Sequence, residues 1–183
     1  MSEYKILNKQ FYSNKDFSIV PIRFEDRYLI MKWRNEQLYH LRQNNPLNRK
    51  TQDNYFRTVI NNLFDQEKPD QLLFSYLKRE KCIGYGGLVH INWINKNAEI
   101  SFIMNTSLEE TLFEFHWSTF LGLIEKLAFE ELKLHKIYVY AFNLRPLLYS
   151  TLINNNYFLD ATLKEHCFFN EKYIDVVIHS KIK

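Results

Sequence analysis

A long helix between two strands is the feature that most constrains the fold. Residues 111–132 place apolar side chains at i, i+3 and i+4, the spacing of a helix that packs one face on a sheet. Residues 97–104 before it and 136–142 after it are typical of strands. A strand, a long helix and a strand predict a β-α-β crossover with two parallel neighbouring strands. We expect these two strands to splay and to form a cleft.

The other elements follow from periodicity and from the polar breaks between apolar runs. Further strands are predicted at residues 17–23, 71–78, 82–92, 162–169 and 172–179, and further helices at 25–35, at 146–154 and from 51 to before Lys68-Pro69. This order predicts an α/β (α+β) fold with a mixed, mostly antiparallel sheet and flanking helices. We expect one domain over residues 17–183 after an N-terminal extension of residues 1–16.

Composition excludes several classes of protein. The chain has 183 residues and is 46% hydrophobic, which is enough for one core and too much for a disordered protein. The net charge of +3 is too small to predict a nucleic-acid-binding surface. Cys82 and Cys167 stand far apart, so neither a disulfide framework nor a metal site is predicted.

Neither a secretion signal nor a membrane span is predicted. The first 20 residues carry charges throughout and offer no apolar core of a signal peptide. The most apolar stretch, residues 112–134, is interrupted by charged residues and cannot be a membrane span. Two widely spaced cysteines fit a reducing compartment, so we expect a cytoplasmic protein.

Several motifs stand in an order that resembles the GNAT superfamily of N-acetyltransferases. They are Trp33-Arg34-Asn35, Ile83-Gly84-Tyr85-Gly86-Gly87-Leu88, Ile91-Asn92-Trp93, Asn97-Ala98-Glu99-Ile100, Leu134-His135-Lys136-Ile137-Tyr138 and Lys164-Glu165-His166. The pattern is most similar to two branches, the ribosomal-protein N-terminal acetyltransferases and the enzymes that acetylate nucleotide-linked amino sugars, such as those of pseudaminic acid synthesis. The stretch from Ile91 to Ile100 favours the sugar branch.

The resemblance implies a reaction and its partners. It implies that acetyl moves from acetyl-CoA to a primary amine of a nucleotide-linked amino sugar or of another small molecule, without a metal. Acetyl-CoA would lie against Ile103, Met104, Asn105 and Arg145, and the acceptor against Arg34, Ser101, Trp93 and His166. We expect neither nucleic acid nor a membrane as a partner.

Glu99 is the predicted catalytic carboxylate. An amine must lose a proton to attack a thioester, which requires a carboxylate or an imidazole within reach. Strand alternation puts Glu99 on the face of Ser101 and opposite Ile100, where it needs a cleft or a partner. His90 on the neighbouring strand is a second candidate base. The alternatives are an exposed or ion-paired Glu99 and a hydrogen-bonded core histidine.

The donor loop departs from the family pattern. The family holds pyrophosphate on the amides of a Q/R-x-x-G-x-G/A loop at a helix N-terminus, whereas residues 105–113 contain no glycine and no Arg or Lys. Glu109 and Glu110 at that end would repel an anion. Capping patterns that begin at Ser107 and Thr111 each explain a helix start without a ligand.

A second departure concerns the general acid. A gapless count places Leu152 where the family has its tyrosine, and Leu cannot protonate a thiolate. Tyr149 lies one turn earlier on the same helix face and either takes this role or packs as an ordinary aromatic. Arg145 falls at the start of this helix, as an alternative phosphate contact. The Gly of the family that ends the helix is Asn156 here, which tolerates the same left-handed backbone.

Three functions remain open from the sequence. The first is an acetyl-CoA-dependent N-acetyltransferase for a small-molecule amine, which we expect because Glu99 and the acceptor-side motifs are present. The second is a protein N-terminal acetyltransferase. The third is a binding or scaffold protein of the same fold that has lost CoA binding, as the altered donor loop would suggest.

Overall fold

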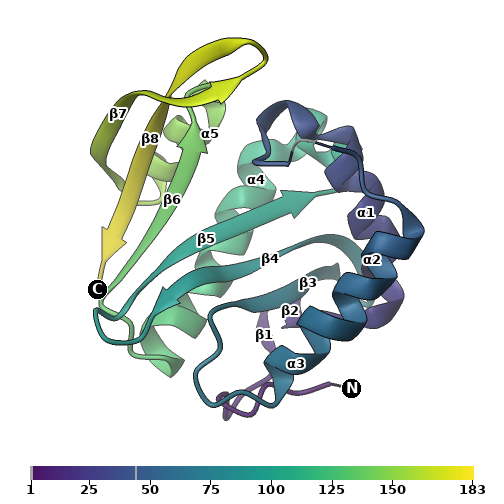
Figure 1. Cartoon of the computed structure of the whole chain (residues 1–183). Coiled ribbons are helices and arrows are strands. Elements are labelled where there is room, and N and C mark those ends of the chain that lie inside the picture. The colour runs from purple at the N-terminus through teal and green to yellow at the C-terminus, as the bar shows by residue number, and fades with distance from the viewer. Residues whose placement is uncertain (1, 44) are drawn as a thin grey trace.

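One mixed sheet organises the chain in the computed structural model, which describes residues 2–43 and 45–183. Its eight strands stand in the order β1-β2-β3-β4-β5-β6-β8-β7 (Figure 1). They are β1 (Tyr12–Asn14), β2 (Phe17–Pro21), β3 (Leu72–Lys78), β4 (Lys81–Asn92), β5 (Asn97–Met104), β6 (Lys136–Phe142), β7 (Phe158–Phe169) and β8 (Lys172–Ile182). β5 and β6 run parallel, and the other neighbours run antiparallel. The expected mixed, mostly antiparallel sheet is confirmed.

Helices cover both faces of this sheet (Figure 1). They are α1 (Arg27–Glu36), α2 (Arg49–Tyr55), α3 (Asn61–Phe64), α4 (Thr106–Glu125) and α5 (Pro146–Asn154). α4 lies behind the central strands in the view of Figure 1, and α1, α2 and α3 lie on the opposite face. α2 begins where Asn48 and Thr51 exchange side-chain and backbone hydrogen bonds. Within the described ranges, no helix is long and apolar enough to cross a membrane.

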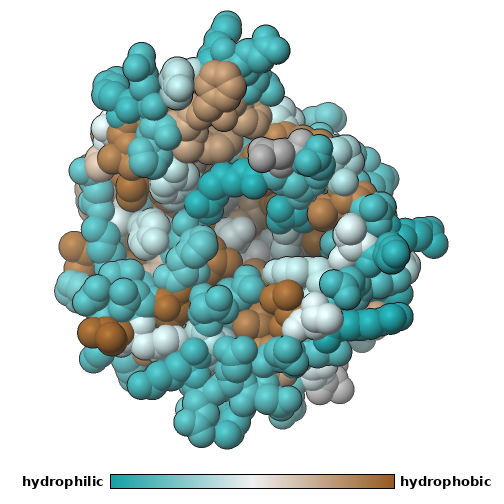
Figure 2. Space-filling model, viewed as in Figure 1, coloured by the Kyte–Doolittle hydropathy of each residue, from teal (hydrophilic) through white to brown (hydrophobic). Residues whose placement is uncertain are grey.

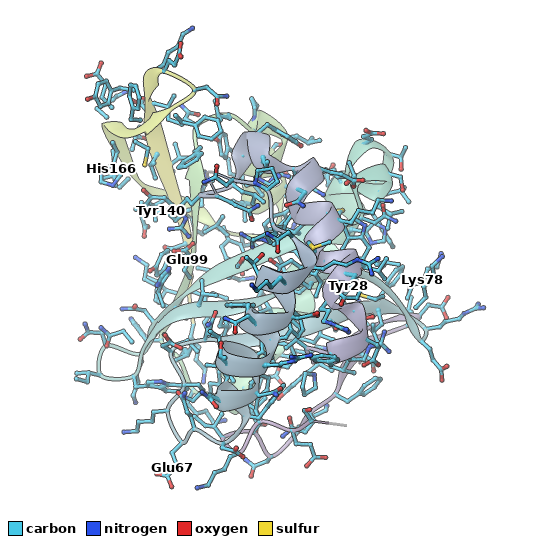
Figure 3. All side chains as sticks on the ribbon, turned by 45° about the vertical axis from the view of Figure 1, so that its right-hand side comes forward. Tyr28, Glu67, Lys78, Glu99, Tyr140 and His166 are labelled. Atoms are coloured by element: carbon cyan, nitrogen blue, oxygen red, sulfur yellow. The ribbon has the colours of Figure 1, made fainter. Side chains whose placement is uncertain are left out.

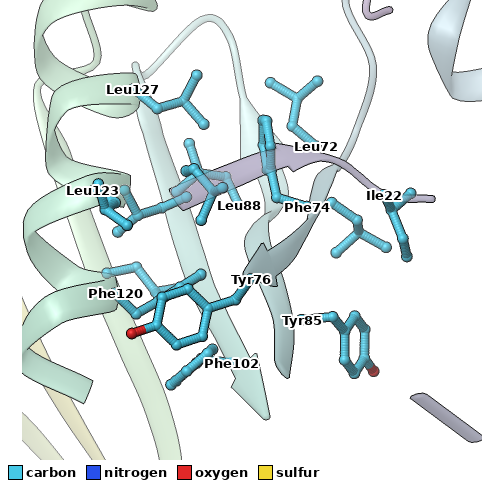
Figure 4. Packing of buried hydrophobic residues seen from close by; sticks show 14 of the residues in the cluster. Ile22, Leu72, Phe74, Tyr76, Tyr85, Leu88, Phe102, Phe120, Leu123 and Leu127 are labelled. Carbon is cyan, nitrogen blue, oxygen red and sulfur yellow. The ribbon is translucent and has the colours of Figure 1, made fainter. Parts of the chain in front are cut away.

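Aromatic side chains fill the layer between α4 and the sheet (Figure 4). Phe102 stacks on Phe120 with ring centroids 4.0 Å apart, and Tyr76 meets Phe120 edge-on at 5.9 Å. Aromatic pairs of this kind add about 0.5–1.5 kcal/mol each beyond the burial of their area. Because Phe102 is held on the α4 side, its neighbours on β5, the odd-numbered residues, face α1 and α2.

The β5–α4–β6 crossover has the predicted connection. β5 and β6 pair from Asn97↔Lys136 to Glu99↔Tyr138, and the register ends there. The two strands then diverge (Figure 1). Residues of both strands line a cavity at this place. The expectation of splayed parallel central strands is confirmed.

α4 begins earlier than the sequence predicts. Its first residue is Thr106, and its cap is Asn105, whose side chain accepts the backbone N–H of Ser107 at 3.2 Å. The helix starts predicted at Ser107 and Thr111 are therefore wrong. The Thr111 hydroxyl lies within the helix and donates to the Ser107 carbonyl at 2.9 Å. Leu112 follows it with a φ of −134°, which interrupts the helical backbone.

The residues before the predicted domain also contribute to the sheet and to the core. β1 pairs with β2 in antiparallel register. Tyr4 is fully buried, and its hydroxyl donates to the Leu73 carbonyl at 2.8 Å. Residues 2–16 therefore pack as part of the same body as the strands that follow.

Gly86 lies where β4 meets β5 and α4. A methyl group on Gly86 would come within 2.2 Å of the Ser101 carbonyl oxygen and 2.9 Å of the Phe120 ring. The glycine-rich stretch thus permits a close approach of two strands and a helix, as its position in a strand predicts.

Candidate functional site

The cleft between β5 and β6 is the main candidate site. Its cavity has a volume of about 160 Å³. The side chains around it are Arg34, His40, Leu41, Arg42, Glu99, Ile100, Ser101, Phe102, Ile103, Trp117, Val139, Tyr140, Ala141, Phe142, Arg145 and Leu148. Figure 2 shows the surface hollowed near the centre of this face. We call this cavity the splay cleft.

Glu99 lies at the point where β5 and β6 separate. It is only 4% exposed, and its carboxylate forms an ion pair with Arg42. Burial raises the pKa of Glu99 above its ordinary value, although Arg42 and His90 both act to lower it. A buried carboxyl of raised pKa beside a cavity is a suitable proton acceptor. The structure places Glu99 and Ser101 together at the cleft, as strand alternation predicts.

His90 lies close to Glu99 because the β4–β5 ladder contains a bulge. The register shifts between Val89 and Asn92, and His90 itself has a φ of 51°. Its Nε2 atom lies 3.9 Å from the Glu99 Oε2 atom, and its side chain is 65% exposed. The imidazole is therefore at the rim of the site, next to the carboxylate, and open to solvent.

Arg42 is a residue of the site that sequence reasoning missed. It comes from the segment between α1 and α2 and lies across the splay, paired with Glu99 on β5. Its guanidinium carbon also lies 4.7 Å from the centre of the Tyr140 ring on β6. Figure 3 shows Glu99 and Tyr140 on these two strands. No sequence signal marks Arg42, because its segment has no periodic pattern.

A second cavity adjoins the splay cleft beneath α1 and α2. Its volume is about 280 Å³. The side chains around it are Ile22, Ile30, Arg34, Leu47, Thr51, Gln52, Tyr55, Phe56, Gln71, Leu73, Tyr85, Val89 and Ser101. Arg34 and Ser101 border both cavities. We call the second cavity the side chamber.

Arg145 and Glu109 form a buried ion pair at the far end of the splay cleft. The Arg145 Nη2 atom lies 2.6 Å from the Glu109 Oε1 atom, and their side chains are 12% and 10% exposed. The Tyr39 hydroxyl also donates to Glu109 at 2.8 Å. Glu109 is therefore paired, rather than free to repel an anion, and Arg145 is paired in turn. Arg145 also contacts the His40 ring at 3.3 Å.

His40 is held neutral in this cluster. Burial lowers the pKa of His40 to about 3, and the neighbouring Arg145 charge acts in the same direction. The last residue of β5 and the residue after it are engaged as well, since the Met104 carbonyl accepts the Gln37 side-chain amide at 2.8 Å and Asn105 caps α4. Ile103 borders the splay cleft directly.

Tyr149, Trp93 and His166, like His90, Met104 and Asn105, do not line either cavity. The Tyr149 hydroxyl donates to the Phe142 carbonyl at 2.9 Å, and its ring stacks on His179. The Trp93 indole donates to the Pro69 carbonyl at 2.9 Å. His166 is exposed on β7 and meets the Tyr140 ring edge-on, farther out than Glu99 (Figure 3). The structure thus does not bring Tyr149, Trp93 or His166 into contact with Glu99.

The described residues hold no group of three or more His, Cys, Asp or Glu side chains that could bind a metal ion. The site instead offers a buried carboxylate, three arginines and a tyrosine around one cleft, with a largely apolar chamber next to it. Such a set can accept a proton and bind anions.

Comparisons with known proteins identify a matching family and similar solved structures. The family described as acetyltransferase (GNAT) domain matches residues 19–178. The chain is similar to the spermidine N-acetyltransferase from Vibrio cholerae in complex with CoA and spermine, with a TM-score of 0.77 at 19% identity over 92% of this chain and 96% of that chain. It is also similar to a dodecameric structure of spermidine N-acetyltransferase from the same organism, with a TM-score of 0.74 at 19% identity over 92% and 95%. At this identity the likeness shows the fold. No curated protein matches the chain.

Proposed function

Because the chain belongs to the GNAT acetyltransferase family, we propose that it transfers the acetyl group of acetyl-CoA to a primary amine of a small molecule in the splay cleft. The observation that carries the proposal is the position of Glu99, a buried carboxylate at the point where β5 and β6 stop pairing. The expected acyltransferase class agrees with the family match.

The transfer forms a bond between the acceptor nitrogen and the acetyl carbonyl carbon and breaks the carbon–sulfur bond of the thioester. An ammonium acceptor loses two protons in all, one before its nitrogen attacks and one after. The departing thiolate takes up one proton, and the other is released. Glu99 is the proposed proton acceptor, because its raised pKa and its burial suit it to receive a proton from an ammonium. His90, 3.9 Å away and exposed, is the proposed route of this proton to solvent.

The donor fits the splay cleft in its central part. Beyond Glu99, β6 no longer pairs with β5, so the backbone groups of β5 that face β6 are available to the amides of a pantetheine arm. Ile103 borders this path, and Met104 and Asn105 end it. Arg145 is the proposed phosphate contact, and it would have to leave Glu109 to serve as one. Tyr149 stays a proposed general acid that reaches the thiolate only if its hydroxyl leaves the Phe142 carbonyl.

For the acceptor, we infer an amine of a nucleotide-linked amino sugar or of another small molecule. The support is the stretch from Ile91 to Ile100, which contains Glu99. Arg34 and Ser101, which border both cavities, are the proposed acceptor contacts, with Trp93 and His166 in outer positions. Spermidine and spermine are named for the similar structures, which share only the fold with this chain. The comparisons favour neither a protein N-terminal acetyltransferase nor a CoA-free scaffold.

Two measurements test the proposal. Calorimetric titration of the full chain with acetyl-CoA should show saturable binding, and release of free CoA in the presence of amines should reveal turnover. Glu99→Gln should keep acetyl-CoA binding and lose most turnover, since the amide keeps the shape of the side chain and loses its basicity. Absence of binding at millimolar acetyl-CoA would contradict the transferase and favour a binding protein of the same fold.

A further inference from the structure

The charges around the two cavities do not balance. Three arginines border the splay cleft, and two of them have a carboxylate partner. Arg42 pairs with Glu99, and Arg145 pairs with Glu109. The third is Arg34, which lies between the splay cleft and the side chamber.

Arg34 contacts neutral groups where the other two arginines contact carboxylates. Its Nε atom donates to the Gln43 side-chain oxygen at 2.7 Å, and its Nη1 atom donates to the Tyr85 hydroxyl at 2.6 Å. Within residues 2–43 and 45–183, no carboxylate forms a salt bridge with it. Arg34 is half-buried, and Tyr85 is buried beside it. A guanidinium withdrawn from water without a counter-ion is costly, because neutral partners replace only part of its hydration.

Among residues 2–43 and 45–183, the hydrogen bonds of Arg34 engage its Nε and Nη1 atoms, and no partner is found for the Nη2 atom. Gln43 and Tyr85 take one N–H each and fix the plane of the group. A planar guanidinium held in this way is suited to a carboxylate or a phosphate, which it binds through parallel hydrogen bonds. The position between the cavities would put such an anion next to an amine that lies at Glu99.

The side chamber is also unsuited to a polycation. The side chains that surround it, among residues 2–43 and 45–183, are apolar, aromatic or neutral polar, apart from Arg34. Among the described residues that line the splay cleft, only Glu99 carries a carboxylate, and it is paired with Arg42. A polyamine would therefore bring several positive charges to a site that is positive before it binds.

We propose that the acceptor amine carries a carboxylate or a phosphate and that Arg34 binds this anion while the rest of the molecule occupies the side chamber. The inference rests on the proposed acetyl transfer and adds the chemical class of its acceptor. It assigns an anionic acceptor to this chain, in contrast to the polyamines named for the structures that share its fold.

Anion binding at Arg34 is tested without knowledge of the acceptor. Thermal unfolding is followed for the full chain in inorganic phosphate, in acetate and in chloride at one ionic strength. The test variant is Arg34→Gln, and the matched control is Lys32→Gln, which removes the same charge from an exposed position of the same helix. Phosphate or acetate should raise the melting temperature of the parent and of the control. The melting temperature of Arg34→Gln should rise less. An equal gain in all three proteins, or a gain in none, overturns the anion site.

Acetyl transfer to matched amines tests the acceptor class. Glucosamine 6-phosphate and glucosamine form one pair of amines, which differ by a phosphate. Phenylalanine and phenylethylamine form the second pair, which differ by a carboxylate. Spermidine is the polycation for comparison. The anionic member of a pair should have the higher kcat/KM by about 10-fold or more, the usual value of charged hydrogen bonds. Arg34→Gln should remove this preference mainly through KM, and Lys32→Gln should keep it.

The outcomes separate the two proposals. Turnover of spermidine above the anionic amines, unchanged in Arg34→Gln, overturns the anionic acceptor and leaves the acetyl transfer intact. A rise in melting temperature with phosphate or acetate that depends on Arg34, without binding of acetyl-CoA, overturns the acetyl transfer and leaves an anion site. The pair that shows the larger preference for its anionic amine then distinguishes a phosphate from a carboxylate.

Discussion

Removal of either partner of the Arg145–Glu109 pair should destabilise the protein strongly. Both side chains are about nine-tenths buried, so loss of one leaves the other charge in a poorly solvated place. Breaking a buried pair typically costs ~3–5 kcal/mol. Glu109 keeps the Tyr39 hydroxyl and Arg145 keeps the Phe113 ring at 4.9 Å, so we expect the lower end, ~3 kcal/mol for Arg145→Met or Glu109→Gln.

The double variant makes this expectation specific to the pair. Arg145→Met with Glu109→Gln leaves neither charge unpaired, so its cost should fall below the sum of the two single costs by ~2–3 kcal/mol. Urea denaturation measures this directly. With a slope of roughly 2 kcal/mol/M, each single variant should lower the midpoint by roughly 1.5 M. Lys5→Gln is the control, since its partner Glu67 is 81% exposed and the pair contributes at most ~1 kcal/mol.

Two results would refute the reasoning. Single variants that cost no more than Lys5→Gln would mean that water reaches both charges in solution. A double variant as unstable as the sum of the singles would mean that the losses come from packing rather than from an unpaired charge.

Three further predictions follow from other residues. Glu99→Gln should lower turnover by about 100-fold, the contribution of a positioned base. It should also remove the acidic limb of the kcat/KM profile, which we expect in the parent at a pH above the ordinary range of a Glu carboxyl because burial raises the pKa of Glu99. Unchanged turnover or an unchanged limb contradicts the assignment. Because the pKa of His40 in the folded protein is about 3, only the unfolded chain gains a proton at this residue as the pH falls below ~6.5. The free energy of unfolding, measured by urea denaturation, should therefore fall by ~2 kcal/mol between pH ~6.5 and ~5. His40→Gln should not show this loss. Gly86→Ala should lower the free energy of unfolding by ~1–3 kcal/mol through overpacking. Gly122 lies in a helix with open space around it, so Gly122→Ala should raise the free energy of unfolding by up to ~1 kcal/mol. Calorimetry that shows changes of the same sign for both variants would disprove this contrast.

The fold could be predicted where local chemistry decides the element. The crossover follows from one apolar helical stripe between two strands, and α5 begins at Pro146, which suits the first position of a helix. The turn between β7 and β8 lies at Asn170 and Glu171, as predicted, and both have positive φ angles. The predicted starts of α4 are wrong because several polar residues between Asn105 and Thr111 can each cap a helix, and in the structure the Ser107 N–H donates to the Asn105 side chain.

The site could be predicted only where one strand defines it. Alternation along β5 puts Glu99 and Ser101 on the side of α1 and α2, and a single strand is enough to show this. The ion-pair partners of the charged residues could not be predicted from the sequence, because Arg42 and Arg145 contact Glu99 and Glu109 from distant segments of the chain. From the sequence, Glu109 is a free carboxylate at a helix N-terminus, whereas in the structure its charge is balanced. The roles of Tyr149, Trp93 and His166 stay predictions.

The altered donor loop and the Arg145–Glu109 pair have one consequence for the donor. The Asn105 side chain already accepts the Ser107 N–H, and Glu109 is paired with Arg145, the proposed phosphate contact. An anion that binds there competes with Glu109 for Arg145, so acetyl-CoA affinity includes the cost of separating the pair. Glu109→Gln should remove this cost and tighten acetyl-CoA binding by about 10-fold, equivalent to ~1.4 kcal/mol, and less at high salt. Arg145→Ala should weaken binding, and calorimetry in which neither change alters the affinity would exclude Arg145 as the phosphate contact.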